Sequence, residues 1–252
     1  MKISRSILFA ASKKRTTGPV GDPYIDDVLL LANFDSGEFV DEEFFYEESL
    51  NGVQCSTYVG TTLDFSSVNA NFGSCASFNG SSAAIETVSS VSGMYNVLQA
   101  TSCTIEMWVY PLSNTLGNIF TIGNGTGSGF DHALLYRNST GGLMHAVPNS
   151  AGNNWQSNVG TNNLLTINNW HHIAFVKNGD NYLTFVNGTL RPEASFTYSG
   201  VPYSPATCKI FICRRSNTAG NLFHGKVDSI RVTNNVARYT DSFTIPTLPF
   251  VL

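Results

Sequence analysis

Charged residues are scarce in this chain. Asp, Glu, Lys and Arg together make up 13% of its 252 residues, about half the share usual in globular proteins. The formal net charge at pH 7 is −4, but residues 1–21 hold 5 of the 14 basic residues and no acid, which leaves 9 basic and 18 acidic residues, a net charge of −9, for the rest. Because nucleic-acid binding needs a basic surface, this acidic body argues against nucleic acid as a main partner.

Long apolar runs are also missing. The stretch from Ile7 to Ala11 is too short for the apolar part of a secretory signal. Basic residues 13–15 follow it, where small residues would lead to a cleavage site. The run from Val28 to Ala32 is far shorter than the ~20 residues that a membrane helix needs. We therefore expect a retained N-terminal arm and no membrane insertion.

Cysteine pairs and metal-binding spacings are absent. The five cysteines are an odd number and include no C-x-x-C pair, so neither a complete disulfide set nor a zinc site is indicated. Free thiols buried in the core are the simplest expectation. The five residues are Cys55, Cys75, Cys103, Cys208 and Cys213.

Patterns that mark enzymes are absent too. The sequence has no G-x-S-x-G elbow, no H-E-x-x-H and no phosphate-binding loop. Glu106 has no partner acid at i+2 or i+4, so it does not form the carboxylate pair that glycoside hydrolases use. His171 and His172 are neighbours on an expected strand and point to opposite faces, so they cannot hold one metal together. We expect a protein that is not an enzyme and needs no cofactor.

The sequence does contain many short apolar segments separated by turn signals, and none has a sustained helical period. In "TIEMWVY", residues 105, 107 and 109 share one face and residues 104, 106, 108 and 110 share the other. Large side chains occur on both faces of this segment, which predicts a central strand of a sheet. The segments of strand length are residues 28–34, 76–79, 83–88, 104–110, 133–137, 171–177, 182–187, 209–213 and 226–233.

Residues 171–188 predict a β-hairpin, because two apolar runs are joined by "NGDN" at 178–181, whose residues tolerate positive φ. Asn187 and Gly188 predict a second tight turn. The acidic stretch at residues 38–48 instead predicts a solvated loop or sheet edge.

Three segments together resemble a known family. They are "CTIEMWVYP" (103–111), "NNWHHIAFVKNGDNYLTFVNGTL" (168–190) and "LFHGKVDSIRVTNNVARYTDSFTIP" (222–246), and they are similar to the laminin-G-like jelly rolls of the concanavalin A-like lectin and glucanase superfamily. "CASFNGSSAAIE" (75–86) fits the family's first core hairpin. The resemblance implies an all-β, two-sheet antiparallel jelly-roll sandwich. We divide the chain into an N-terminal docking arm, 1–24, and the sandwich, 25–252.

The ending "IRVTNNVARYTDSFTIP" is similar to laminin-G-like domains of bacteriophage tail and other virion proteins. It implies a virion structural protein, either a tail-fibre adhesin or a capsid decoration protein, and leaves tail and head open. The expected partners are other virion proteins, further copies of the chain in a homo-oligomer and a host surface glycan. The alternative is a carbohydrate-binding lectin-type domain of a cell-surface or secreted protein. Within this ending, Arg238 and Tyr239 are expected to anchor the C-terminal tail to the sandwich.

A ligand surface is expected where exposed aromatic side chains stand beside amides, because this combination suits stacking on a sugar together with hydrogen bonds. Trp155 lies in the expected loop "SAGNNWQSN", whereas Trp108 and Trp170 are expected in the core. Relatives of this fold bind calcium at the rim, where Asp35 and Asp131 could serve although neither aligns with a motif. The candidate ligand residues are Phe130, Asp131, His132, Asn153, Asn154, Trp155 and Tyr203.

The arm is expected to dock onto another subunit rather than onto its own sandwich. It is too small to form a core alone, and it carries an apolar patch followed by basic residues. The acidic stretch at 38–48 of a neighbouring copy, or another virion protein, could receive it. The docking residues are Ile7, Leu8, Phe9, Lys13, Lys14 and Arg15.

Overall fold

The computed structural model describes residues 22–34, 39–41, 44–46, 54–57, 62–64, 73–88, 90, 93–94, 97–124, 131, 133–204, 207–215 and 221–250. The predicted docking residues of the arm, between positions 7 and 15, lie outside this part of the chain. Only Asp22, Pro23 and Tyr24 of the predicted arm belong to it.

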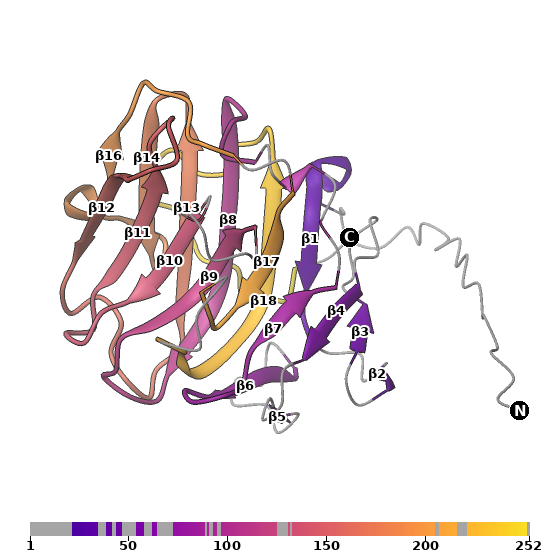
Figure 1. Cartoon of the computed structure of the whole chain (residues 1–252). Helices are drawn as coiled ribbons and strands as arrows, with labels where there is room; N and C mark the ends of the chain where they lie inside the picture. The colour runs from indigo at the N-terminus through magenta and orange to yellow at the C-terminus, as the bar shows by residue number, and fades with distance from the viewer. Residues whose placement is uncertain are drawn as a thin grey trace, which may run out of the picture.

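Two antiparallel sheets of nine strands each make up the described structure (Figure 1). Sheet A runs in the order β15-β14-β13-β8-β18-β6-β5, with β1 on β18 and β16 on β14, and sheet B runs β12-β11-β10-β9-β17-β7-β4-β3-β2. Sheet A contains β1 (Val28–Ala32), β5 (Thr62–Asp64), β6 (Cys75–Asn79), β8 (Ser102–Pro111), β13 (His171–Asn178), β14 (Asn181–Val186), β15 (Thr189–Leu190), β16 (Phe196–Thr197) and β18 (His224–Asn234). Sheet B contains β2 (Phe39–Asp41), β3 (Phe44–Tyr46), β4 (Gln54–Thr57), β7 (Ile85–Thr87), β9 (Gly117–Gly123), β10 (Ala133–Arg137), β11 (Leu143–Pro148), β12 (Trp155–Thr161) and β17 (Lys209–Ile212).

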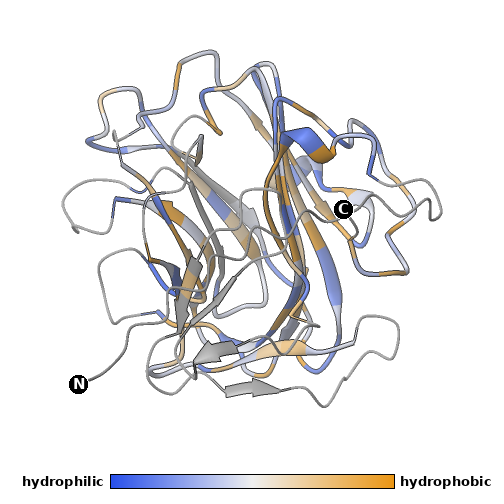
Figure 2. Cartoon of the chain, turned by 90° about the vertical axis from the view of Figure 1, so that its right-hand side faces the viewer, coloured by the Kyte–Doolittle hydropathy of each residue, from blue (hydrophilic) through white to orange (hydrophobic). Residues whose placement is uncertain are grey.

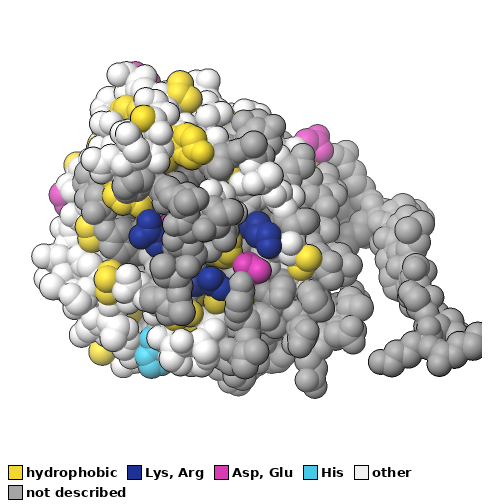
Figure 3. Space-filling view, viewed as in Figure 1, with side chains coloured by type: hydrophobic (Ala, Val, Ile, Leu, Met, Phe, Trp, Pro, Cys, Tyr) yellow, Lys and Arg dark blue, Asp and Glu magenta, His cyan; other side chains and the backbone are white. Residues whose placement is uncertain are grey.

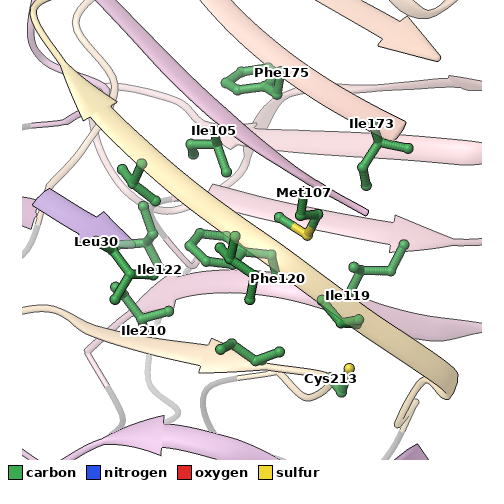
Figure 4. Close-up of a cluster of buried hydrophobic side chains, with 14 of the residues drawn as sticks. Leu30, Ile105, Met107, Ile119, Phe120, Ile122, Ile173, Phe175, Ile210 and Cys213 are labelled. Carbon is green, nitrogen blue, oxygen red and sulfur yellow. The ribbon is translucent and has the colours of Figure 1, made fainter. Parts of the chain in front are cut away.

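The sheets face each other across one apolar core. Ile105 and Met107 of β8 enter it from sheet A, and Phe120, Ile122 and Ile210 enter it from sheet B (Figure 4). In the side view of Figure 2 the ribbons change repeatedly between hydrophobic and hydrophilic colours, as strands with two different faces do. The predicted all-β sandwich is therefore confirmed.

A second apolar layer covers the outer face of sheet A. The tail at residues 235–250 follows β18, and its Phe243 packs on Phe185 and stacks with Tyr239. Phe250 forms a smaller cluster with Val28 and Leu31 of β1. Because both of its faces are covered, β13 is buried from its first residue to its seventh.

The central position of β8 is confirmed, since β8 pairs with β13 on one side and β18 on the other. The hairpin of β13 and β14 is confirmed as well, with Asn178 opposite Asn181 and Gly179 at φ 61°. Asn187 and Gly188 turn with φ of 51° and 73° between β14 and β15. All five cysteines are free and buried, as expected.

The sequence did not predict several strands of sheet B. β9 is buried throughout, so it lacks the alternation that marks a half-buried strand. The acidic stretch at residues 38–48 contributes β2 and β3 to one end of sheet B, which agrees with the predicted sheet edge. Two short 3-10 turns, Ile25–Asp27 and Pro192–Ala194, interrupt the β structure. No helix in the described ranges has the length and apolar character needed to cross a bilayer.

Candidate functional site

Glu106, the strand acid considered for catalysis, lies in a buried ion-pair network on the outer face of sheet A. Its side chain is fully buried. The guanidinium of Arg231 donates to Oε1 from Nε at 2.9 Å and from Nη2 at 2.7 Å. The hydroxyl of Tyr239 donates to Oε2 at 2.8 Å, and Nε2 of His172 lies 3.2 Å from the same oxygen. Both carboxylate oxygens are therefore occupied by groups of the chain itself.

Asp22 extends this network to the N-terminal end of the sandwich. Its Oδ2 accepts hydrogen bonds from Arg231 Nη1 at 2.9 Å and from Arg238 Nη2 at 2.6 Å. Asp22 thus contacts its own sandwich, although the sequence placed it in an arm that docks elsewhere. Together with the bond from Tyr239 to Glu106, these contacts anchor the tail, as predicted for Arg238 and Tyr239.

The network keeps its carboxylates ionised. Burial by itself would raise the pKa of Glu106, but the hydrogen bond from His172 and the positive charge of Arg231 outweigh it and lower this pKa to about 2. For Asp22, burial is likewise outweighed by the hydrogen bond from Arg238, and its pKa is lowered. These two ionised carboxylates, whose oxygens accept hydrogen bonds from the chain itself, connect the tail, the strands β8 and β18 and the N-terminal segment.

Four of the predicted ligand residues lie at the turn between β11 and β12, namely Asn153, Asn154, Trp155 and Tyr203. The backbone carbonyl of Asn149 accepts hydrogen bonds from Gly152 N at 3.0 Å and from Tyr203 N at 3.1 Å. Tyr203 therefore reaches this turn from a segment about fifty residues later in the sequence. Its ring lies directly over Gly152, where a Cβ atom would come within 2.5 Å of Tyr203 Cγ, so only glycine fits.

Amide side chains line the same turn. Asn149 Nδ2 donates to Asn153 Oδ1 at 2.9 Å, and Asn154 Oδ1 accepts a hydrogen bond from Trp155 N at 2.8 Å. Asn153 and Asn154 are exposed, and Trp155 is half-buried. The loop assignment of Trp155 was wrong, because this residue begins β12 opposite Pro148. Phe130 and His132 lie outside the described residues.

Arg215 joins Asp131 to Trp155 and was not predicted. Its Nε donates to Asp131 Oδ2 at 2.8 Å, and its guanidinium carbon lies 5.7 Å from the centre of the Trp155 ring. Asp131 is 5% exposed and Arg215 is 32% exposed. The sequence did contain a feature that could have identified Arg215 as a site residue. Two consecutive arginines, Arg214 and Arg215, are unusual in a domain with so many acidic residues. The rim cluster, as we name it, comprises Asp131, Asn153, Asn154, Trp155, Tyr203 and Arg215.

Basic side chains gather near the middle of the face of the molecule seen in Figure 3, next to an acidic one. Among the described residues, no three His, Cys, Asp or Glu side chains come together in a way that could hold a metal ion. Asp131 is paired with Arg215, and Asp35 lies outside the described ranges. Calcium at the rim stays a prediction.

Comparisons with known proteins agree on the fold. A family model described as the concanavalin A-like lectin/glucanases superfamily matches residues 79–238. The receptor binding domain of a botulinum neurotoxin C/D mosaic serotype has a TM-score of 0.59 at 10% identity, over 88% of this chain and 49% of that chain. The binding domain of botulinum neurotoxin DC in complex with rat synaptotagmin II has a TM-score of 0.58 at 12% identity, over 83% and 48%.

The same neurotoxin domain in complex with SialylT has a TM-score of 0.57 at 12% identity, again over 83% of this chain and 48% of that chain. The chain thus spans about half the length of these solved structures. At such identities the likeness shows the fold alone. No curated protein sequence matches the chain.

Proposed function

We propose that this chain, which belongs to the concanavalin A-like lectin/glucanases superfamily, is a non-catalytic binding domain that recognises a surface glycan. The observation that carries the proposal is the rim cluster, in which an aromatic ring, two exposed amides and an arginine from distant segments meet at one turn. Loops positioned by a rigid sandwich are the usual place for recognition.

The chemistry of the rim cluster suits a sugar. A pyranose ring packs its C–H face on an aromatic ring, and its hydroxyl groups exchange hydrogen bonds with amides. Trp155 and Tyr203 supply the rings, and Asn153 and Asn154 supply the amides. The hydrogen bonds between Asn149 and this turn hold these groups in place, which lowers the entropy lost on binding.

The non-catalytic part of the proposal rests on Glu106. Glycoside hydrolysis needs two carboxyl groups that flank the scissile bond. Glu106 is fully buried and bonded to Arg231 and Tyr239, so a substrate would have to displace the tail to reach it.

We place this domain on a virion surface, as an adhesin of a tail fibre or as a decoration protein of the shell. The support is the resemblance of its C-terminal segment to virion laminin-G-like domains, together with an arm suited to docking on a neighbouring subunit. A lectin-type domain of a cell-surface protein would use the same sugar chemistry. Recovery of the chain in purified virus particles would support the virion protein. Its recovery in a cell-surface fraction alone would support the lectin-type domain of a cell-surface protein.

The test is a glycan array followed by titration of every hit with wild type and Trp155→Ala. We expect the substitution to weaken binding at least tenfold, because it removes the stacking ring. Val201→Ala is the matched control, since Val201 is 60% exposed and lies two residues from Tyr203. Unchanged affinity of Trp155→Ala for a proven ligand removes this residue from the site, and a chain that binds no glycan at all contradicts the proposed function.

A further inference from the structure

From the geometry of Arg215 we infer that the recognised glycan carries a carboxylate, so that the ligand class is an acidic sugar with a uronic-acid or sialic-acid unit. This inference rests on the proposed function and names the chemistry of the same site. It depends on three features of Arg215, namely how it is held, which hydrogen bonds its nitrogens make within the described residues and which charges surround it.

Two contacts hold the guanidinium of Arg215 in place. Asp131, itself 5% exposed, accepts from Nε at 2.8 Å. The ring of Trp155 lies 5.7 Å away from the guanidinium carbon. A long arginine side chain normally loses conformational freedom when it binds a ligand. Here that freedom is already restricted in the free protein, so the group is prepared for recognition.

Among the described residues, none accepts a hydrogen bond from the terminal nitrogens of Arg215, Nη1 and Nη2. The side chain is 32% exposed. These two nitrogens and the parallel oxygens of a carboxylate form the bidentate pair that arginine favours. A neutral hydroxyl group satisfies one nitrogen at most and offers no charge. The guanidinium edge formed by Nη1 and Nη2 therefore favours a ligand with a planar anionic group.

The surrounding charges favour a single carboxylate over a polyanion. Arg214 lies next in the chain, with Nε donating to the Arg215 carbonyl at 3.1 Å, so two guanidinium groups stand at this end of β17. Asp131 lies within ion-pair distance of Arg215. The chain as a whole has a net charge of −4, which repels a densely charged polymer such as a nucleic acid. A sugar chain with widely spaced acidic units is attracted by the two arginines and is repelled less by the net negative charge of the chain.

The experiment compares acidic oligosaccharides with neutral counterparts of the same shape by isothermal titration of the full chain. The probes are trigalacturonate and sialyllactose, each compared with its own methyl ester. We expect at least one acidic probe to bind, and its neutral counterpart to bind at least tenfold more weakly. Equal binding of acid and ester overturns the carboxylate inference and leaves the glycan proposal standing. Binding of neither kind by the chain contradicts both.

Variants of Arg215 locate the effect. Arg215→Lys keeps a positive charge beside Asp131 but loses the paired nitrogens, and Arg215→Gln loses both. We expect at least tenfold weaker binding of the acidic probe for Arg215→Lys, a larger loss for Arg215→Gln, and little change for the neutral probe. Lys209→Gln is the control, because Lys209 of β17 pairs with Glu86 of β7 at 3.7 Å and is not part of the rim cluster. Wild-type affinity of Arg215→Lys, with an unchanged melting temperature, refutes the role of the bidentate contact.

Discussion

Among single residues, Glu106 is fully buried and is contacted by the side chains of Arg231, Tyr239 and His172. Replacing Glu106 with Gln removes the negative charge and leaves Arg231 buried without its main partner. Breaking a buried ion pair in this way costs about 3–5 kcal/mol. We expect Glu106→Gln to lower the free energy of unfolding by this amount, measured by urea denaturation at pH 7.

Glu86→Gln is the matched control for that measurement. Glu86 pairs with Lys209 at 3.7 Å on a strand of sheet B, but both side chains are partly exposed. An exposed pair contributes about 1 kcal/mol or less. Similar losses for the two variants would contradict the structural importance that we assign to the Glu106 network.

His145 makes the stability of the sandwich depend on pH. It is buried between Phe175 and Phe196, with Nδ1 2.8 Å from Thr184 Oγ1, and burial lowers its pKa from 6.5 to about 3. Below pH 6.5 the unfolded chain binds a proton here that the folded chain does not bind. The contribution of His145 to the free energy of unfolding is therefore fully present above pH 6.5. It falls by about 1.4 kcal/mol per pH unit as the pH drops from 6.5 towards 3.

The pH dependence is tested by comparing wild type with His145→Gln in urea at pH 7 and pH 5. Gln keeps a polar partner for Thr184 and does not titrate. We expect the wild type to lose about 2 kcal/mol more than the variant between these pH values. Parallel pH profiles for the two proteins would show that His145 is not the group responsible.

At the scale of elements, the three tryptophans occupy three different settings. Trp108 is 5% exposed on the outer face of β8, where His172 packs against it. Trp170 is half-buried just before β13 and packs on Tyr110. Trp155 begins β12, the edge strand of sheet B. Only Trp108 is buried within a sheet that is covered on both sides.

Alanine substitutions should follow this order. Trp108→Ala is expected to cost about 3–5 kcal/mol, because truncating a buried tryptophan leaves a large cavity. Trp170→Ala should cost less, since this residue is not fully buried, and Trp155→Ala should cost least. Thermal melts of the three variants measure the order. Equal losses would mean that Trp155 belongs to the core and not to a ligand surface.

At the scale of the whole molecule, the boundary between arm and sandwich lies before Asp22. A chain of residues 22–252 keeps the bonds from Arg231 and Arg238 to Asp22, and we expect its melting temperature to equal that of the full chain. A chain of residues 25–252 loses them and should be less stable by about 1–3 kcal/mol, the contribution of charged hydrogen bonds. Calorimetry of both truncations checks the boundary.

The 22–252 chain also tests the docking arm. If residues 1–21 dock onto another subunit, the 22–252 chain stays folded but no longer enters the assembly that the full chain joins. A 22–252 chain that unfolds more easily than the full chain shows that the arm supports its own sandwich. A 22–252 chain that assembles normally removes the docking role of the arm.

Local patterns determined the class of fold. The alternation in residues 104–110 and the turn at 178–181 are properties of neighbouring residues, so they identified β8 and the β13–β14 hairpin without knowledge of the third dimension. β9 could not be found in this way, because it is buried on both faces and has no polar side to alternate with. The sequence also indicated Asn153, Asn154 and Trp155 as candidate ligand residues, since amides and an aromatic ring are neighbours in the chain, but it did not show that Trp155 begins a strand.

The contacts that these residues make depend on the folded chain. Asp131 and Arg215 are 84 positions apart, and Asp22 and Arg238 are 216 apart. No short-range pattern records such pairs, because the antiparallel sheets bring distant segments together through backbone hydrogen bonds that any sequence can make. The sequence could therefore name Trp155, its neighbouring amides and Asp131 as a candidate surface. The fold supplied Arg215, which adds a positive charge to this surface, and paired it with Asp131.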